Sequence, residues 1–305
     1  MTDLRIVFMG TPEFAVPSLE ILIENKFNVV AVITAPDKPQ GRGQKLIPSH
    51  IKGCALKHGI SVLQPTNLKS PEFLSELESY HANLQIVVAF RMLPEAVWAM
   101  PILGTFNLHA SLLPQYRGAA PINWAIINGE QETGVTTFFL KHEIDTGSII
   151  FQEKELIRDT DDVGSLYERL KVKGGQLVLN TVRAIEVGNA PSLPQPETGE
   201  IHHAPKIFKE TCEIQWSKTA SEVRNLVRGL SPYPAAWTVL HKKIFKIFKI
   251  SFTNLQKEGA PGDFFTEAKN YLYIRASDQW ISVDEFQPEG KRRMNVREYL
   301  AGNVV

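Results

Sequence analysis

The stretch that decides the fold is Leu4–Pro12, with the sequence LRIVFMGTP. Leu4 to Met9 form a short apolar run rich in β-branched residues, and Gly10-Thr11-Pro12 ends it with residues typical of a tight turn. Helical spacing of apolar residues follows from Phe14 to Ile23, with Pro17 near the start of the helix, where proline is tolerated. The opening therefore predicts the first strand and helix of an α/β domain.

The same alternation continues through the first half of the chain. Further strands are expected at Asn28–Thr34, Ser61–Leu63, Leu84–Phe90, Gly134–Leu140 and Ser148–Glu153. Further helices are expected at His50–His58, Ser70–Glu78 and about Val163–Val187, the last with a possible interruption at Gly174-Gly175. Strands that are apolar on both faces and alternate with helices indicate a parallel sheet covered on both sides. We expect a Rossmann-like, doubly wound α/β domain over residues 1–188.

The second half has a different pattern. Residues 189–206 (NAPSLPQPETGEIHHAPK) are rich in proline, glycine and polar residues and predict a linker. A helix is expected at Ala220–Leu230, and Asn295 is expected to cap a final helical turn with Glu298 at the capping-box position. Short strands separated by turn signals predict a smaller OB-like β-barrel over residues 207–305. These strands are Ala236–Leu240, Ile244–Phe252, Asn270–Arg275 and Gln279–Phe286.

Composition excludes several classes of protein. The chain has 305 residues, 43% hydrophobic and 22% charged, which suffices for two cores. Cys54 and Cys212 have no cysteine or histidine at metal-ligand spacing, so neither a disulfide framework nor a metal site is expected. The sequence has no apolar run of about 20 residues and no signal-peptide pattern, so we expect a cytoplasmic protein with no membrane segment.

Charge is balanced over the whole chain but not along it. The totals are 33 basic and 33 acidic residues. From Lys206 onward there are 16 basic and 11 acidic residues, an excess of +5, which leaves −5 for the part before Lys206. A basic C-terminal part can hold a polyanion such as nucleic acid, although a chance fluctuation would give the same balance.

Three polar residues of the first domain suggest chemistry at a carbonyl centre. Asn107 and His109 are two apart in FNLHASLLP, so in an extended segment they share one face. An amide N–H can stabilise an oxyanion, and an imidazole can accept or deliver a proton. Asp145, in KHEIDTG, could orient that imidazole and stabilise its charged form. By spacing alone, an Asn-x-His is more often an ordinary hydrogen-bonded pair than a catalytic one.

These motifs resemble the formyltransferase family that uses N10-formyltetrahydrofolate. The shared pattern is Asn107-Leu108-His109, then SLLPQYRG from Ser111 to Gly118, then Asp145. The resemblance implies that Asn107 holds the formyl oxygen, that His109 manages the proton of the attacking amine, and that Asp145 pairs with His109. It also implies a folate site and no metal. The folate site would be lined by Ser111, Leu112, Leu113 and Pro114.

The segment Phe90-Arg91-Met92 departs from the family pattern, which usually has Tyr-Gly in place of Phe90-Arg91. Glycine allows a positive φ and a close approach of the backbone to a ligand, whereas arginine does so poorly. By resemblance, these three residues border the folate pocket. One hypothesis is that Arg91 meets the acidic tail of the folate.

Three features resemble the branch of the family whose acceptor is methionyl initiator tRNA. The first is the opening FMGTPEFAVP, and the second is the loop at residues 34–49, which carries Lys38, Arg42 and Lys45. A basic loop can follow a phosphate backbone, and Arg42 falls on the key arginine of the family's loop. The alternative is a solvated surface loop. The third feature is the basic C-terminal region, whose motifs HAPK, IQW, RNLVR and QPEGKRRM resemble a tRNA-binding module.

The resemblance thus implies an enzyme that transfers a formyl group to the amino group of methionine on initiator tRNA, and we expect it to be a monomer. One alternative is formylation of a small amine, such as a nucleotide-linked sugar, which would not depend on tRNA. Another is an RNA-binding protein on an inactive scaffold, which would require a broken catalytic set. Asn107, His109 and Asp145 are all present.

Overall fold

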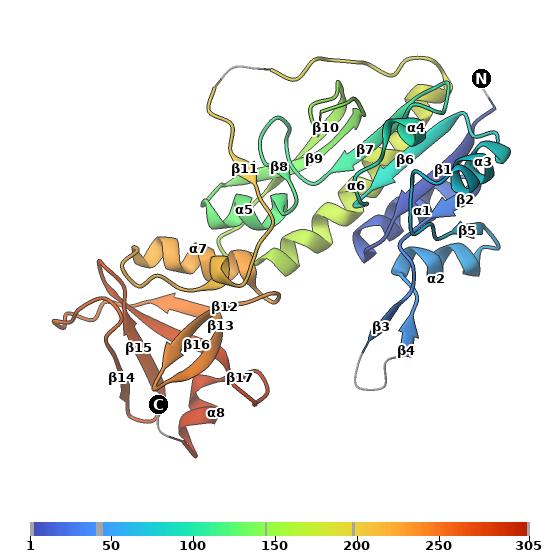
Figure 1. The fold of residues 1–305 in the computed structure, drawn as a ribbon. Helices are drawn as coiled ribbons and strands as arrows, with labels where there is room; N and C mark the ends of the chain where they lie inside the picture. The colour runs from blue at the N-terminus through green and yellow to red at the C-terminus, as the bar shows by residue number, and fades with distance from the viewer. Residues whose placement is uncertain (1–2, 41–44, 144, 197–198, 304–305) are drawn as a thin grey trace. The chain divides into compact units, whose positions relative to one another are not determined.

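The structure, a computed structural model, describes residues 3–40, 45–143, 145–196 and 199–303. The chain divides into two compact units (Figure 1). The first contains residues 1–117, 134–155 and 167–202, and the second contains residues 118–133, 156–166 and 203–305. The domain boundaries expected at residues 188 and 206 remain predictions.

The first unit is built on a seven-stranded sheet with the order β10-β9-β7-β6-β1-β2-β5. The pairs β1–β2, β1–β6, β2–β5 and β6–β7 are parallel, whereas β9 runs antiparallel to β7. The predicted doubly wound α/β class is therefore confirmed, with an antiparallel strand added beside the parallel ones. The strands are β1 (Arg5–Gly10), β2 (Asn28–Ile33), β5 (Ser61–Leu63), β6 (Leu84–Val88), β7 (Thr105–His109), β9 (Glu132–Phe139) and β10 (Ile149–Leu156).

Helices cover both faces of this sheet. Phe73 and Leu77 of α3 pack in one cluster with Val87 of β6, whereas α6 contacts Leu108 of β7. Leu108 is in register with Val88, and side chains alternate along a strand, so α3 and α6 lie on opposite faces. The helices are η1 (Glu13–Ala15), α1 (Val16–Glu24), α2 (His50–Lys57), α3 (Pro71–Ser79), α4 (Glu95–Trp98) and α6 (Val163–Glu186).

Gly174 and Gly175 do not interrupt α6, contrary to the expectation from sequence. A Cβ on Gly174 would lie 2.7 Å from Cδ2 of Leu108, and one on Gly175 would lie 3.1 Å from the carbonyl carbon of Pro17. The two glycines therefore allow the helix to approach the sheet and α1 closely. Leu108 stands between Asn107 and His109, so this packing supports the strand that carries both residues.

The second unit contains an antiparallel sheet with the order β12-β13-β16-β15-β14, and β17 pairs with β16. The expected second domain of antiparallel strands is thus present, and among the described strand pairs none joins β12 to β14 to close the expected OB-like barrel. Short alternating strands have the same pattern in an open sheet and in a barrel, which is why the sequence did not distinguish them. The strands are β12 (Ala236–Leu240), β13 (Lys243–Phe252), β14 (Phe264–Glu267), β15 (Tyr271–Arg275), β16 (Trp280–Pro288) and β17 (Met294–Asn295).

Helices and short segments complete this unit. Asn123 of α5 donates to the carbonyl oxygen of Gly229 of α7 at 2.8 Å. Asn295 caps α8 as expected by accepting from the backbone N–H of Glu298, and the carboxylate of Glu298 is bonded to Arg292. The remaining helices are α5 (Pro121–Ile127), α7 (Ala220–Leu230), α8 (Val296–Leu300) and η2 (Glu210–Cys212), and the short strands β8 (Arg117–Gly118) and β11 (His203–Ala204) pair with each other. In the first unit, β3 (Lys38–Gln40) pairs with β4 (Lys45–Ile47) as a hairpin. In the part of the chain that the structure describes, no helix is both long and apolar enough to cross a bilayer.

Gly147 provides a test of the packing near Asp145. It is buried, and a Cβ at this position would overlap the carbonyl oxygen of Phe139 at the end of β9. We therefore expect Gly147→Ala to lower the free energy of unfolding by at least about 2 kcal/mol in a urea titration. Gly53→Ala is the matched control, because a Cβ on Gly53 of α2 has open space around it and should stabilise the helix by about 0.5–1 kcal/mol. Equal stability of the two variants would contradict this packing.

Candidate active site

Asn107 and His109 lie on β7, at the carboxyl end of the parallel part of the sheet. Their side chains share one face of the strand, because Asn107 and His109 are separated by one residue. The segment that begins at Ala89 leaves the neighbouring parallel strand β6 at the same edge. In open α/β sheets, ligands bind outside the carboxyl ends of the strands, so this edge is the candidate site.

His109 is held in a defined orientation. Its side chain is 8% exposed, and Nε2 lies 2.9 Å from the carbonyl oxygen of Tyr116. A carbonyl oxygen can only accept, so Nε2 carries a hydrogen, and in the neutral ring Nδ1 holds the lone pair. Nδ1 lies 4.0 Å from Oδ2 of Asp145. Nδ1 can therefore take up a proton beside a carboxylate that stabilises the resulting charge.

Asp145 lies between β9 and β10, and its side chain is 12% exposed. Its φ of 54° is in the left-handed region, which most residues with a side chain avoid and which aspartate and asparagine adopt more often than the others. The side-chain amide of Gln195 donates to the carbonyl oxygens of Asp145 and Gly147 at 2.7 and 2.9 Å. The predicted pair of His109 and Asp145 is thus brought together, with a backbone that other residues hold in place.

The amide of Asn107 has unused hydrogen-bonding capacity. Its Oδ1 is buried and has no hydrogen-bond partner among the described residues. Buried polar atoms are nearly always paired, and leaving one unpaired costs roughly 1–3 kcal/mol. A bound polar group is a natural partner, so this atom fits a ligand site.

The predicted folate-site residues Ser111–Pro114 come two residues after His109 and are tied to β9 and β10. Thr136 of β9 donates to the carbonyl oxygen of Ser111 at 2.6 Å and accepts from the N–H of Leu113 at 3.1 Å. Gln152 of β10 donates to the carbonyl oxygen of Leu113 at 2.8 Å. The side chain of Leu113 is buried in the core with Phe138, so it shapes this segment from within. Leu112 and Pro114 are partly exposed.

At the Phe90-Arg91-Met92 segment, the family usually has a glycine where this chain has Arg91, and glycine would allow a positive φ there. The positive φ occurs at Ala89, at 49°, and not at Arg91. The guanidinium of Arg91 donates to the carbonyl oxygens of Pro65 and Thr66 and lies 5.6 Å from the centroid of the Phe90 ring. Met92 is 73% exposed. Arg91 therefore ties this edge to the chain after β5, and Met92 presents apolar surface.

The basic loop forms the β3–β4 hairpin. Lys38 is exposed, Arg42 lies outside the described residues, and only the backbone of Lys45 is described.

The base of this hairpin is bonded to α2 and to the residue after β5. Lys52 Nζ lies 2.6 Å from Oδ2 of Asp37, and the amide of Gln64 donates to Oδ1 of Asp37 and to the carbonyl oxygen of Ala35, both at 2.8 Å. Hydrogen bonds from Lys52 and Gln64 hold the pKa of Asp37 below its usual value. Sequence reasoning missed Lys52 and Gln64, because these partners are separated from the hairpin along the chain.

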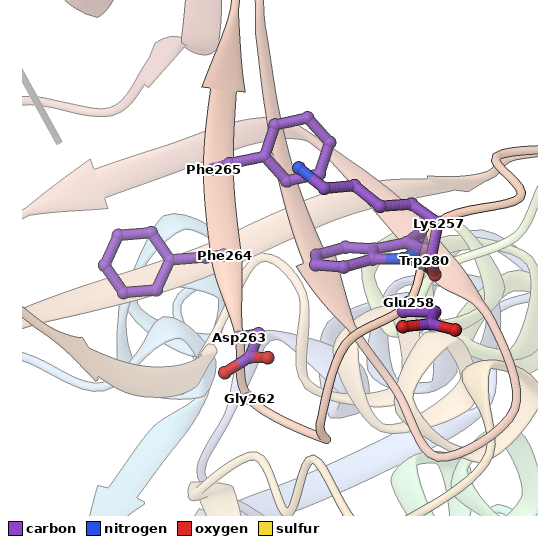
Figure 2. A pocket seen from close by; sticks show the side chains of 7 residues that line it. All are labelled: Lys257, Glu258, Gly262, Asp263, Phe264, Phe265 and Trp280. Atoms are coloured by element: carbon purple, nitrogen blue, oxygen red, sulfur yellow. Dashed lines mark hydrogen bonds between the residues drawn. The ribbon is translucent and has the colours of Figure 1, made fainter.

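A separate cavity of about 350 Å³ lies in the second unit. Figure 2 shows the Lys257 side chain reaching over Trp280 toward the Phe265 ring, with 3.7 Å between Nζ and the ring centroid. The indole N–H of Trp280 donates to the carbonyl oxygen of Lys257. Glu258 and Asp263 also line the cavity, so its charge is mixed and favours no class of ligand.

Comparisons with known proteins agree with the family resemblance. A family model described as formyl transferase matches residues 4–182, and one described as formyl transferase, C-terminal domain matches residues 206–304. The methionyl-tRNA formyltransferase of Bacteroides fragilis is 54% identical over 98% of this chain and 95% of its own length. That of Flavobacterium johnsoniae is 50% identical over 99% of this chain and 97% of its own.

Solved structures show the same fold. An N-formyltransferase from Helicobacter canadensis, in complex with folinic acid and dTDP-3-aminofucose, has a TM-score of 0.69 at 23% identity, covering 92% of this chain and 98% of its own. The predicted family is confirmed by the two family models and by the relatives. The chain belongs to the formyl transferase family, in the branch of the methionyl-tRNA formyltransferases.

Proposed function

We propose that this chain transfers the formyl group of N10-formyltetrahydrofolate to the amino group of methionine carried by initiator tRNA. The observation that carries the proposal is the pairing of His109 Nδ1 with Asp145 at 4.0 Å, on the strand that also carries Asn107, whose Oδ1 has no hydrogen-bond partner among the described residues. The full-length likeness to methionyl-tRNA formyltransferases supports tRNA as the acceptor. We also propose that the protein is a cytoplasmic monomer.

The described residues fit a folate donor. Asn107 offers a buried polar atom that has no partner in the part of the chain that the structure describes, and Met92 offers exposed apolar surface at the same edge of the sheet. We assign the holding of the folate to the segments Phe90–Met92 and Ser111–Pro114. A neighbour of the same fold binds folinic acid, which is a formylated tetrahydrofolate. When bound, the donor supplies the activated formyl carbon.

Each residue of the site has one role in the transfer. Nδ2 of Asn107 donates to the formyl oxygen, where negative charge develops, a contribution worth about 10²–10³-fold in rate. Nδ1 of His109 takes the proton that the methionine amine loses as its nitrogen bonds to the formyl carbon, and returns a proton to N10 as the bond from N10 to that carbon breaks and tetrahydrofolate leaves, worth about 10²–10⁴-fold. Asp145 stabilises the charged imidazole. The carbonyl oxygen of Tyr116 holds Nε2–H, so that Nδ1 is the nitrogen that accepts the proton.

The acceptor is engaged by the basic hairpin and by the basic C-terminal part of the chain. We assign to Lys38, Arg42 and Lys45 the role of following the phosphate backbone of the tRNA. The bonds from Lys52 and Gln64 to the base of the hairpin support this role, because they tie its first strand to the sheet.

The test of this function is a panel of acceptors offered to the full chain with labelled N10-formyltetrahydrofolate. Methionyl initiator tRNA, free methionine and an amino-sugar nucleotide are compared, and we expect transfer to the charged tRNA alone. Transfer to the amino sugar alone would refute tRNA as the acceptor but would leave the assigned roles of the catalytic residues unchanged. A chain cut after residue 206 is a poor substitute, because it would remove α7, on which α5 packs.

Arg42→Ala is expected to lower kcat/KM for tRNA by about tenfold and to reduce the slope of log affinity against log salt by about one, because one phosphate contact is lost. Filter binding at several salt concentrations gives the slope, and folate affinity is expected to stay unchanged. Lys57→Ala, which removes an exposed positive charge from α2, is the control. An unchanged slope for Arg42→Ala would make the hairpin an ordinary surface loop.

A further inference from the structure

Gln195 belongs to the proline-rich segment that the sequence predicts as a linker, yet it is 8% exposed. The segment is bonded to the first unit. Leu193 and Ile149 exchange two backbone hydrogen bonds of 2.7 and 2.9 Å, at the start of β10. The chain is thus brought alongside the loop that carries Asp145.

The side-chain amide of Gln195 uses its full hydrogen-bonding capacity. Its Nε2 donates to the carbonyl oxygens of Asp145 at 2.7 Å and of Gly147 at 2.9 Å. Its Oε1 accepts from Nε and Nη2 of Arg117 at 3.2 and 2.5 Å. A guanidinium can only donate, so Arg117 sets which end of the amide faces the two carbonyl oxygens.

We infer that Gln195 is a positioning residue for Asp145, and that Arg117 orients the Gln195 amide for this task. Asp145 has a left-handed backbone, which is unfavourable unless the surroundings hold it. The bond from Gln195 to its carbonyl oxygen fixes the peptide plane from which the side chain projects toward His109. This role rests on the proposed function, in which Asp145 stabilises the charge on His109.

The chemistry of the contact is specific for an amide. Glutamate would keep, and strengthen, the bond with Arg117 but would turn an acceptor toward the two carbonyl oxygens of the loop. Methionine would fill a similar volume but would make neither set of bonds. If the donating half of the amide is what holds Asp145, both substitutions remove it.

The experiment compares full-length Gln195→Glu and Gln195→Met with the wild type in formyl transfer to methionyl initiator tRNA. We expect kcat to fall about 10-fold to 100-fold in both variants, because buried carbonyl oxygens lose their donor. KM for the tRNA and for the formyl donor should stay within about threefold, since the proposed role of Gln195 is to hold Asp145 and not to bind either ligand. Leu193→Ala is the control, because its side chain is 58% exposed and its backbone bonds remain, so its kcat should match the wild type.

A wild-type kcat in Gln195→Glu would overturn the positioning role and leave the proposed function intact. A parallel fall in kcat, in both affinities and in the melting temperature would also overturn it, because that pattern marks a purely structural residue. A wild-type chain that formylates no tRNA would instead refute the proposed function, and the inference with it.

Discussion

Replacing Asp145 by asparagine is expected to lower kcat for formyl transfer by about 10²–10⁴-fold, with tRNA affinity unchanged within about threefold. Asparagine has the shape of aspartate and tolerates the left-handed backbone that Asp145 adopts, with its φ of 54°, so the substitution removes the charge and little else. Without the carboxylate at 4.0 Å from Nδ1 of His109, the protonated imidazole loses its nearest stabilising charge. Single-turnover transfer at saturating donor measures the effect, and filter binding measures tRNA affinity.

Asp3→Asn is the control for this experiment, because Asp3 is an exposed aspartate near the start of β1. It should transfer at the wild-type rate. Equal losses of turnover and of tRNA affinity in Asp145→Asn would contradict the assigned role, since a residue that acts on His109 has no part in holding the acceptor.

Asn107→Leu should lower kcat by about 10²–10³-fold, because it removes the donor for the formyl oxygen while keeping a similar volume. Most substitutions of buried residues lower the free energy of unfolding, whereas Asn107→Leu should not. Oδ1 of Asn107 is buried with no hydrogen-bond partner in the described ranges, so its removal relieves a desolvation cost. We expect the free energy of unfolding to stay unchanged or to rise by up to about 1 kcal/mol.

Urea unfolding and single-turnover transfer, measured on the same preparation of Asn107→Leu, test this combination. Loss of activity with full stability is the signature of a residue kept for chemistry. A loss of more than about 2 kcal/mol of stability would show that Asn107 serves the packing of β7, and the fall in activity would then have a structural origin.

Much of the fold could be predicted because its signals are local. The strand Ser61–Leu63 and the helix Ala220–Leu230 were predicted with the same bounds that β5 and α7 have in the structure. Apolar periodicity and capping residues are properties of the segments themselves, so the sequence shows them directly. The antiparallel direction of β9 and the open edge of the second sheet could not be predicted in this way. Strand direction and closure depend on partners that are remote in the sequence.

In the candidate site, too, some residues could be predicted from the sequence and others depend on remote contacts. Asn107, His109 and Asp145 were expected from a resemblance, because the spacing of Asn-x-His alone favours an ordinary polar pair. Gln195 was missed because it lies in a segment rich in proline, glycine and polar residues, which predicts a linker. Its partners Arg117 and Asp145 are 78 and 50 residues away along the chain. The positive φ of Ala89, two residues before Arg91, is likewise a property of the folded chain.

The most direct test follows the formyl group to its acceptor. The full chain is incubated with N10-formyltetrahydrofolate and methionyl initiator tRNA in a single turnover, the ester bond to the tRNA is hydrolysed, and the released amino acid is identified by mass spectrometry. N-formylmethionine from the wild type, formed about 10²–10⁴-fold more slowly by His109→Ala, is the predicted result. Release of unmodified methionine by the wild type, or formation of N-formylmethionine at the wild-type rate by His109→Ala, would contradict transfer to the methionine amine by this site.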